Sequence, residues 1–506
     1  MGRVQTPTLA MICSRYLKNK DFKPQTYFKV KVHTAKDTTT FPVLSMDKYD
    51  THPAADEVLQ RVRAAGSLRV MSVEKKEVKQ EPPLLYDLTA LQKEANSKHG
   101  FSAEKTLNIA QALYEGKKIS YPRTGSRYIS ADVLDEIPHL IATLKNHLCF
   151  GAYASGMENI VLHIRSVDDQ KVTDHHALII TGDPADGLTG DERTIYDMVA
   201  GRMLEAFSCS CTKENTAVTL DTGGVHFACK GSVTLLPGWR GVFGATDEEV
   251  QDEDITTLPP LAEGDMLPVR DTEALEKQTQ PRPLHTEASL LSAMESAGKD
   301  ITNEDEREAM KESGIGTPAT RAAIIETLFA REYIVREKKA LVPTNKGLVV
   351  YLAVKDKKIA DVSMTGQWEF ALNKIGMGEM DAATFHRSIE VYASQVTTEL
   401  LDIAFERTDD RSGCSCPKCK NGQVIFFQKV AKCNNETCGL TVFRSIAKKD
   451  LTDTQLTALL MNGKTGIIRG FTSSKGKPFD AAVAFDTDYK TVFEFENKGG
   501  KKGKTK

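Results

Sequence analysis

The chain of 506 residues lacks several features that would point to whole classes of protein. It has no apolar run approaching the length of a membrane-spanning helix, so we expect no membrane partner. Its first residues do not have the pattern of a secretory signal, and we therefore expect a cytoplasmic protein. It also lacks an excess of one charge: 66 Lys and Arg face 69 Asp and Glu, giving a formal net charge of −3. Any nucleic-acid site must therefore be a local basic groove.

What the chain does contain is enough for several packed domains. Hydrophobic residues make up 40% of it, and its length suggests about three or four domains. A lysine- and glycine-rich run closes the sequence, and we expect residues 493–506 to form a basic tail. Such a tail either touches phosphates loosely or only keeps the chain in solution.

Half of the ten cysteines lie close together near the end of the chain. Reduced thiols are expected in the cytoplasm, so this cluster indicates a metal site rather than disulfides. Cys416 and Cys419 form a C-x₂-C knuckle, and Cys433 and Cys438 follow after thirteen residues with a looser spacing. Two such pairs fit tetrahedral Zn²⁺, with Cys414 as a competing ligand. A metal-free packing module is the alternative.

One segment, residues 119–128 (ISYPRTGSRY), combines a phenol with two guanidinium groups in a run of small residues. Pro122 favours an extended conformation at Tyr121, so that Tyr121 and Arg123 project from the same side of the backbone. A free phenol has a pKa of about 10 and becomes a nucleophile at neutral pH only when positive charge favours the phenolate. The planar guanidinium of Arg123 also suits a phosphate under attack. A tyrosine and an arginine on a strand edge would be the ordinary alternative.

The segment resembles the active-site motif of type IA DNA topoisomerases, in the topoisomerase III branch. Four further blocks are similar to blocks of that family and occur in the same order, which makes a chance match very unlikely. These blocks are residues 2–9 (GRVQTPTL), 173–179 (TDHHALI), 314–321 (GIGTPATR) with 324–328, and 341–347 (LVPTNKG) with 365–369 (TGQWE).

The resemblance implies a multidomain α+β fold. The sequence alternates between helical and strand-like stretches, beginning and ending with a helical one, five in all. This order indicates either nested insertions or five small consecutive domains. The family favours nesting, with a β arch joining two helical domains into a toroid that admits DNA. We therefore expect a helical base with a winged-helix-like unit (1–24 and 280–405), a β arch (25–86 and 210–279), a helical tyrosine domain (87–209) and a C-terminal zinc-ribbon-like repeat (410–492).

The same resemblance implies roles for individual residues. Tyr121 would attack a backbone phosphate of single-stranded DNA to give a 5′-phosphotyrosine and a free 3′-OH, without ATP. Arg123, His175 and Arg3 would complete the catalytic set, His175 rather than His176 being the histidine that matches. The residues expected to contact DNA are Arg127, Gln5, Arg321 and Thr317.

The chain begins immediately before the first block, so we expect it to lack the family's Toprim domain. That domain carries the glutamate and the Asp-x-Asp pair that hold Mg²⁺. The acidic run at residues 251–254 contains an Asp-x-Asp, which we interpret as solvated surface. A separate Toprim-containing chain is then an expected partner. The alternatives are a remnant that binds single-stranded DNA without cutting it and a tyrosine recombinase, although none of the blocks fits a recombinase.

Overall fold

The computed structural model describes residues 2–157, 161–244, 257–300, 304, 314–401, 414–427, 429–473 and 476–495. The chain divides into two compact units, Met1–Leu400 and Leu401–Lys506. The acidic run 251–254 and the tail from residue 496 lie outside the described residues. In the described ranges no helix is both long and apolar enough to cross a membrane.

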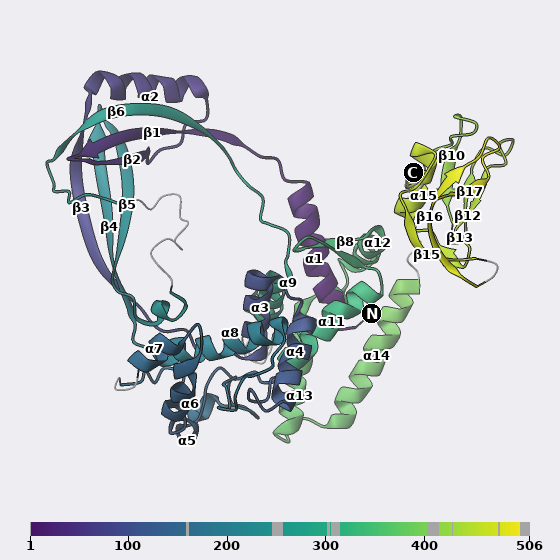
Figure 1. Ribbon diagram of the computed structural model, residues 1–506, viewed down its shortest axis with the longest axis horizontal. Helices are drawn as coiled ribbons and strands as arrows, with labels where there is room; N and C mark the ends of the chain where they lie inside the picture. Colours follow the sequence, from purple (N-terminus) through teal and green to yellow (C-terminus); the bar gives the residue numbers. More distant parts are fainter. Residues whose placement is uncertain are drawn as a thin grey trace, which may run out of the picture. The chain divides into compact units, whose positions relative to one another are not determined.

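Six long strands form a closed barrel in the first unit (Figure 1). Their order around the barrel is β1-β2-β5-β4-β3-β6, and all neighbours are antiparallel. Both segments predicted to form a β arch contribute strands to it. The strands are β1 (Thr26–Lys36), β2 (Thr39–Ser45), β3 (Ser67–Gln80), β4 (Cys211–Thr222), β5 (Val225–Leu236) and β6 (Met266–Gln278).

The barrel core follows the alternation of side chains along each strand. Val30 and Val32 on β1 are fully buried, whereas Lys29 and Lys31, which alternate with them, are only half-buried and lie on the opposite face. Strands β3, β4 and β5 bury a similar set of aliphatic and aromatic side chains in the same core. The two faces of β1 are therefore chemically distinct.

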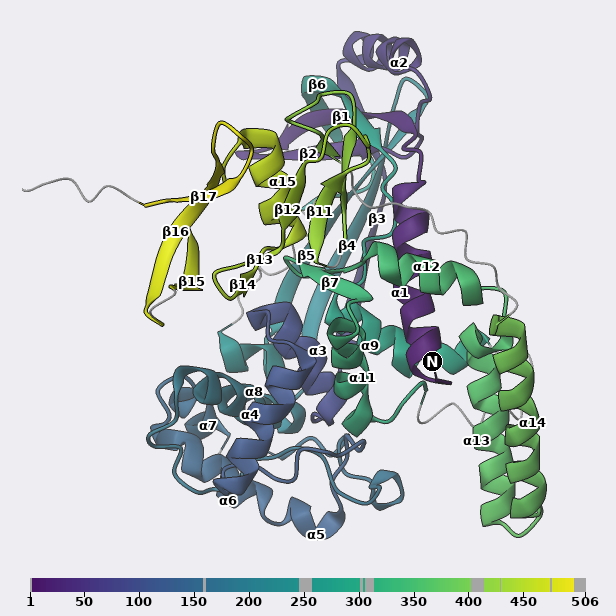
Figure 2. The same ribbon diagram turned by 90° about the vertical axis from the view of Figure 1, so that its right-hand side faces the viewer.

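A helix inside the first arch segment is a correction to the sequence interpretation, which gave strands throughout residues 25–80. Helix α2 runs from His52 to Ala65 and lies on the side of the barrel away from the other helices in both views (Figures 1 and 2). The Thr51 side chain accepts a hydrogen bond from the Ala54 N–H at its start. It ends at Gly66, whose φ of 67° is a left-handed conformation that glycine adopts without strain.

The tyrosine-bearing part is helical but contains two long irregular stretches, 116–130 and 161–189. Ser102 caps α4 by accepting a hydrogen bond from the Lys105 N–H. One large core joins the helices to the irregular stretches. The helices are α3 (Leu88–His99), α4 (Ala103–Glu115), α5 (Ala131–Leu134), α6 (Ile137–Thr143), α7 (Gly151–Gly156) and α8 (Gly190–Phe207), with single turns η1 (Leu144–Asn146), η2 (Asp169–Lys171) and η3 (Gly238–Phe243).

The base of the first unit contains the predicted helix, hairpin and helix of a winged-helix-like unit. A buried core joins α1 to α9, α11 and the hairpin, and a smaller cluster joins α13 to α14 (Figure 2). The elements are α1 (Gln5–Lys20), α9 (Glu287–Glu295), η5 (Ala297–Asp300), α11 (Pro318–Ala330), β7 (Ile334–Glu337), β8 (Ala340–Pro343), α12 (Asn345–Val354), η6 (Lys358–Ala360), α13 (Val362–Gly376) and α14 (Ala382–Leu401).

Contacts between the two helical parts close the first unit into a ring. At one end of the barrel, the chain leads from α1 into β1 and from β6 back towards α9 (Figure 1). At the other end, β3 leads to α3, and α8 leads to β4. Helix α3 then packs against α9 and α11. The Lys93 ammonium lies 2.9 Å from a Glu295 carboxylate oxygen across this interface. The toroid implied by the resemblance is thus present in the first unit.

The second unit consists of small antiparallel sheets around one core. Four short strands carry the cysteines, and a three-stranded sheet and one helix follow. Its elements are β9 (Cys414–Ser415), β10 (Gln423–Phe426), β11 (Val430–Cys433), β12 (Thr441–Phe443), β13 (Ser445–Ile446), β14 (Lys449–Asp450), α15 (Asp453–Asn462), β15 (Ile468–Thr472), β16 (Pro478–Phe485) and β17 (Thr491–Glu494).

Candidate active site and zinc site

The loop that carries Tyr121 is fixed at its start to the segment that carries the paired histidines. The Ser120 N–H donates to the Ile179 carbonyl at 2.9 Å, and the Ser120 hydroxyl donates to the Ala177 carbonyl at 3.1 Å. An isolated antiparallel bridge pairs Ile119 with Ile180 beside them. Both isoleucines are buried, so the base of the loop is part of the core.

Thr124 fixes the loop a second time, beyond the tyrosine. Its side chain is 1% exposed, and its hydroxyl donates to the His175 carbonyl at 2.8 Å. The same oxygen accepts a hydrogen bond from the Ser126 N–H at 3.0 Å. The Thr124 carbonyl accepts one from the Leu88 N–H at the start of α3, at 3.1 Å. Tyr121 therefore lies between two anchored points.

The Tyr121 ring is half-buried between two other rings. Its centroid lies 4.5 Å from that of His175 and 5.2 Å from that of Tyr114, which meets it edge-on. His176 instead directs its Nδ1 to the Ala177 carbonyl at 2.7 Å. The structure thus brings His175, the predicted histidine of the pair, next to the predicted nucleophile. Tyr114, which the sequence interpretation missed, supports the ring from the other side.

The two arginines of the tyrosine loop differ in what they contact. Arg123 is exposed and forms no hydrogen bond or ion pair with any residue that the structure describes. Arg127 is half-buried, and its guanidinium donates to the carbonyls of Leu85 and Leu84 at 3.1 and 3.4 Å. Arg123 is therefore available to a phosphate. The predicted DNA contact by Arg127 would compete with its hydrogen bonds to this backbone.

Arg3 is held by the start of α13. Its Nη1 lies 2.6 Å from a Glu369 carboxylate oxygen, and its guanidinium carbon lies 5.7 Å from the centre of the Trp368 ring. The buried Thr365 hydroxyl donates to the Arg3 carbonyl at 2.9 Å. Thr365 and Glu369 were missed as site residues, although both belong to the block 365–369 that carried the family resemblance. Their spacing of four on one helix was the available signal.

The turn before α11 brings the start of α1 close to the tyrosine loop. A Cβ placed on Gly125 would lie 3.5 Å from Cγ of Pro318, and one on Gly316 would lie 3.4 Å from Cγ1 of Val4. Thr317 is exposed between these two contacts, at the N-cap of α11. The exposed N-terminus of α11 thus lies beside the tyrosine loop, where a phosphate would be favoured by the helix dipole.

Two residues predicted to contact DNA are less accessible. Gln5 is half-buried as the first residue of α1. Arg321 is 1% exposed; its Nε donates to the Ile315 carbonyl at 3.3 Å and its Nη1 to the Thr89 hydroxyl at 2.9 Å. Burial lowers the pKa of Arg321, although the negative charges of Glu295 and Asp87 act to raise it. The burial of Arg321 points to a role in joining α11 to α3 rather than to a direct DNA contact.

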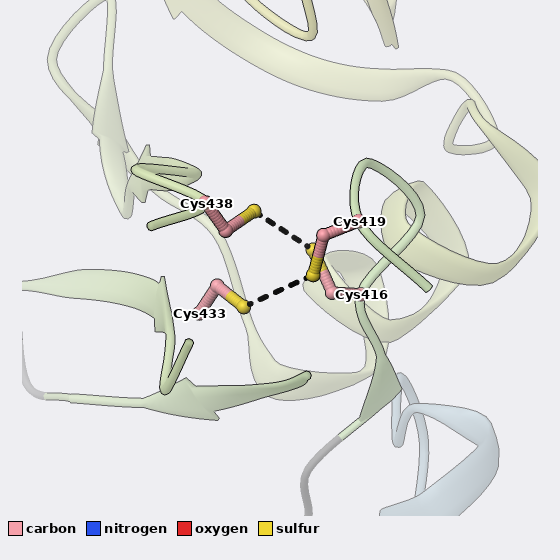
Figure 3. Close-up of side chains that lie close together, drawn as sticks. All are labelled: Cys416, Cys419, Cys433 and Cys438. Carbon is pink, nitrogen blue, oxygen red and sulfur yellow. Dashed lines mark hydrogen bonds between the residues drawn. The ribbon is translucent and has the colours of Figure 1, made fainter. Parts of the chain in front are cut away.

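Four cysteines of the second unit converge as zinc ligands would (Figure 3). The Sγ atoms of Cys416, Cys419, Cys433 and Cys438 all lie within 4.8 Å of one another. Those of Cys416 and Cys438 are 3.5 Å apart, and those of Cys419 and Cys433 are 3.7 Å apart. Tetrahedral Zn²⁺ with Zn–S bonds of ~2.3 Å needs sulfurs ~3.8 Å apart, so the set fits this ion.

Neighbouring groups favour the arrangement of the sulfurs. A Cβ on Gly422 would lie 2.6 Å from the Sγ of Cys433, so a larger residue there would displace a ligand. The Asn435 N–H donates to the Cys433 Sγ at 3.4 Å. Burial raises the pKa of Cys419, but hydrogen bonds from the Asn421 backbone and from the other thiols outweigh it and bring that pKa to about 6. Cys414, the predicted competitor, is not part of this set.

No comparable set of carboxylates accompanies the tyrosine. Among the residues that the structure describes, the four cysteines are the only group of three or more His, Cys, Asp or Glu side chains close enough to share one metal ion. The described part of the chain therefore offers no cluster of three or more carboxylates for the Mg²⁺ implied by the resemblance.

A family of known proteins matches this arrangement over most of the chain. The family described as DNA topoisomerase matches residues 1–387, which include the tyrosine loop, the histidine segment and the turn before α11. The chain belongs to this family. A second family, described as the C-terminal repeat of topoisomerase, matches residues 437–496. The tyrosine recombinase alternative has no such support.

Individual relatives place the chain in the type IA, topoisomerase III-like branch. It is 33% identical to DNA topoisomerase 3 of Bacillus subtilis over 471 residues, which is 88% of this chain and 63% of that protein. It is 34% identical to DNA topoisomerase 3 of Bacillus licheniformis over 468 residues, 87% of this chain and 62% of that protein. The chain thus spans less than two thirds of the length of these relatives.

A solved structure supports the fold. Full-length topoisomerase I from Thermotoga maritima superposes with a TM-score of 0.63 at 25% identity, covering 89% of this chain and 72% of that one. The multidomain α+β fold and the toroid predicted from the sequence are confirmed. The assignment of roles to individual site residues stays a prediction.

Proposed function

We propose that this chain provides the tyrosine-bearing part of a type IA DNA topoisomerase that cuts and rejoins one DNA strand without ATP. The observation that carries the proposal is the setting of Tyr121. It lies on a loop anchored at Ser120 and Thr124, with the His175 ring against it and the exposed Arg123 two residues away. The family match adds to this observation.

In the proposed reaction the Tyr121 Oη attacks a backbone phosphorus of DNA. The new bond is a phosphotyrosine to the 5′ side, and the bond that breaks is the one to the 3′ oxygen, which leaves as a hydroxyl after taking up a proton. Rejoining reverses these steps, so the energy of the broken bond is retained. Arg123 stabilises the extra negative charge on the phosphate, because a guanidinium donates two parallel hydrogen bonds to such oxygens.

His175 is proposed to hold the phosphate or to move the proton. Its ring lies beside the nucleophile, and an imidazole N–H can donate to a phosphate oxygen in either role. Arg3 is proposed to act from the segment that precedes α1, held by Glu369. Thr317 offers its exposed hydroxyl and the N-terminus of α11 to the same strand.

Mg²⁺ is expected to come with a Toprim domain, either in a separate chain or joined to this one. The ion would supply positive charge near the phosphate. The steps above describe only what the residues of this chain do.

We propose further that the substrate is single-stranded DNA and that the second unit helps to hold it. A groove there is lined by Phe479, Phe493 and Phe495 together with Lys448 and Lys477. Bases stack on such rings while lysines contact phosphates. Replacement of the exposed Phe495 by Ala is then expected to weaken binding of an oligo(dT) probe several-fold, whereas unchanged binding would count against this role. DNA as substrate is consistent with the predicted cytoplasmic location, which stays a prediction.

The test is to trap the covalent adduct. The protein is incubated with a 3′-labelled single-stranded oligonucleotide, whose label stays on the fragment joined to Tyr121, and Mg²⁺, with and without a separately purified Toprim domain from a relative, and denatured. We expect a protein–DNA adduct that requires the Toprim domain and disappears in Tyr121→Phe, which removes only the attacking oxygen. Tyr114→Phe is the matched control and should keep the adduct.

Two other outcomes would change the proposal. An adduct that forms without the Toprim domain would mean that the chain itself supplies the metal site. If no adduct forms under either condition while the oligonucleotide still binds, the chain is a single-strand-binding protein and not an enzyme.

A further inference from the structure

A pocket of about 410 Å³ lies on the barrel, far along the sequence from the tyrosine loop. Strands β1, β2, β5 and β6 contribute its walls. A volume of this size is within the range of sites that hold small organic ligands. Nothing in the chemistry of Tyr121 requires it.

The pocket lies on the outer face of the barrel, not in its core. On β1 its lining residues are Lys29 and Lys31, which alternate with the core valines. Lys29 pairs across the sheet with Leu275 on β6, and Lys31 with Leu44 on β2. Each of these lysines therefore has a leucine directly beside it on the same face. Helix α2 packs against the barrel core and takes no part in lining the pocket.

Four ammonium groups surround the pocket, and no carboxylate lines it. They belong to Lys29, Lys31, Lys230 and Lys277. Lys31 lies 2.9 Å from a Glu273 carboxylate oxygen, but the other three form no ion pair or hydrogen bond within the described part of the chain. Three uncompensated positive charges around one concavity repel one another, and a bound anion relieves that repulsion.

The floor and walls of the pocket are apolar. Pro42, Leu44 and Leu275 are half-buried, and Met46 is 56% exposed at the rim. A small inorganic anion would leave this apolar surface in contact with water. A ligand with one or two phosphates and a flat, weakly polar body would cover it and meet the lysines at the same time.

We infer that this lysine pocket, defined by Lys29, Lys31, Lys230 and Lys277 over Leu44 and Leu275, is a second nucleotide-binding site. It takes one nucleotide, with its phosphate among the ammonium groups and its base on the leucines. The nucleotide is either a unit of a DNA strand or a free nucleotide, since both present the same chemistry. The first source rests on the proposed function, because it supposes that DNA reaches the barrel.

The experiment uses the full chain and an oligonucleotide of eight thymidines in which some carry a photoreactive 4-thio group. After irradiation and digestion, the cross-linked peptides are identified by mass spectrometry. We expect cross-links to the barrel strands β1, β2 or β6, in addition to those at the tyrosine loop. In Lys29→Gln/Lys277→Gln the barrel cross-links should fall at least about tenfold, since each lost phosphate contact also removes released counterions.

The matched control is Lys76→Gln/Lys79→Gln. It removes the same charge from exposed positions on β3 that do not line the pocket. It should leave the barrel cross-links unchanged, and both variants should keep the cross-links at the tyrosine loop. Equal losses in the two variants would mean that total charge, and not this pocket, attracts the probe, and would overturn the inference.

Thymidine 5′-monophosphate separates the two sources. If it competes at submillimolar concentration for the barrel cross-links only, the pocket takes a free nucleotide; if only unlabelled oligonucleotide competes, it takes a DNA strand.

Cross-links at the tyrosine loop without any in the barrel would overturn the inference and leave the proposed function intact. If no peptide is cross-linked, the proposed function fails. Calorimetry with thymidine 5′-monophosphate then tests nucleotide binding by the pocket independently of the proposed function. The absence of binding heat would overturn the inference.

Discussion

Thr124 links the two segments of the candidate active site through one buried hydroxyl. It donates to the His175 carbonyl and accepts from the Ser126 N–H. We expect Thr124→Val, which keeps the shape but removes both hydrogen bonds, to lower the free energy of unfolding by about 1–3 kcal/mol. Because His175 and Tyr121 would shift, adduct formation should slow by about tenfold to a hundredfold. Chemical denaturation and the trapping assay measure the two effects.

Serine is the control at this position. Thr124→Ser retains the hydroxyl and should restore most of the adduct rate, although it leaves a small void. If Thr124→Val were as active as the unmodified protein, the hydroxyl would have no part in positioning the site.

Gly422 limits what can stand beside the zinc ligands. A Cβ there would lie 2.6 Å from the Sγ of Cys433, so Gly422→Ala must displace that sulfur. We expect zinc affinity to fall by at least about tenfold, measured by competition with a chromogenic chelator. Gly466→Ala is a suitable control, because its Cβ would meet no atom within 4 Å. Equal zinc affinity in both variants would contradict the proposed ligand set.

The residues proposed to react were easier to predict from the sequence than the residues that hold them. Tyr121, Arg123 and His175 were singled out because they lie in blocks that resemble those of a known family. Thr124 and Glu369 were not, because each acts through a partner that is distant in the sequence. The partner of Thr124 is His175, 51 positions away, and the partner of Glu369 is Arg3, near the start of the chain. Arg321 was expected at an exposed helix start, and its side chain is buried here, while its contact with DNA stays a prediction.

At the scale of elements, β6 leads into α9 through a buried histidine. His285 is 4% exposed, and burial, reinforced by the positive charge of Arg15, lowers its pKa to about 4. Between pH 6.5 and 4 the unfolded chain therefore binds a proton that the folded chain does not, and stability falls as the pH falls through this window. We expect a loss of about 2 kcal/mol from this group, less than the whole pKa difference implies because solvent screens part of it.

The measurement is the difference between two proteins. Thermal or urea unfolding of the original chain and of His285→Gln should be compared from pH 7 to pH 4. The free energy of unfolding of the variant should depend less steeply on pH over that range. Parallel curves would show that His285 titrates normally in the folded state.

Elements with a strong local signal were predicted well, and α2 was not. The cap at Ser102 and the hairpin after α11 follow from nearby residues alone. Helix α2 also has local signals in Thr51 and Gly66, but it lies between strands with clear alternation, and the alternation was extended over it. The closed barrel required pairing between segments more than 200 positions apart, which the family resemblance supplied and the periodicity did not.

At the scale of the whole first unit, the ring closes through side chains on α3 and α9. We expect that joining Lys93→Cys to Glu295→Cys with a short bifunctional maleimide will reduce relaxation of supercoiled plasmid, measured with the Toprim domain added, by at least about tenfold, because the interface can no longer open. Cleavage of an oligonucleotide at Tyr121 should persist. The experiment needs a Cys149→Ser/Cys209→Ser background, since these two thiols are exposed.

Reagents with one reactive group serve as the control. They modify the same cysteines without joining them and should leave relaxation near that of the unmodified protein. Full relaxation after cross-linking would mean that the strand passes elsewhere.

The pairing of β1 with β6 also affects how the chain is made. Thr26 and Gln278 meet across a separation of 252 positions. On the ribosome, β1 must therefore wait until about 250 further residues have been synthesised before its partner strand emerges. Residues 87–209 lie between them and have a core of their own, so they can fold first. Until β6 arrives, one edge of β1 is unpaired and exposed to aggregation, and the half-buried lysines along it keep that edge from joining another chain.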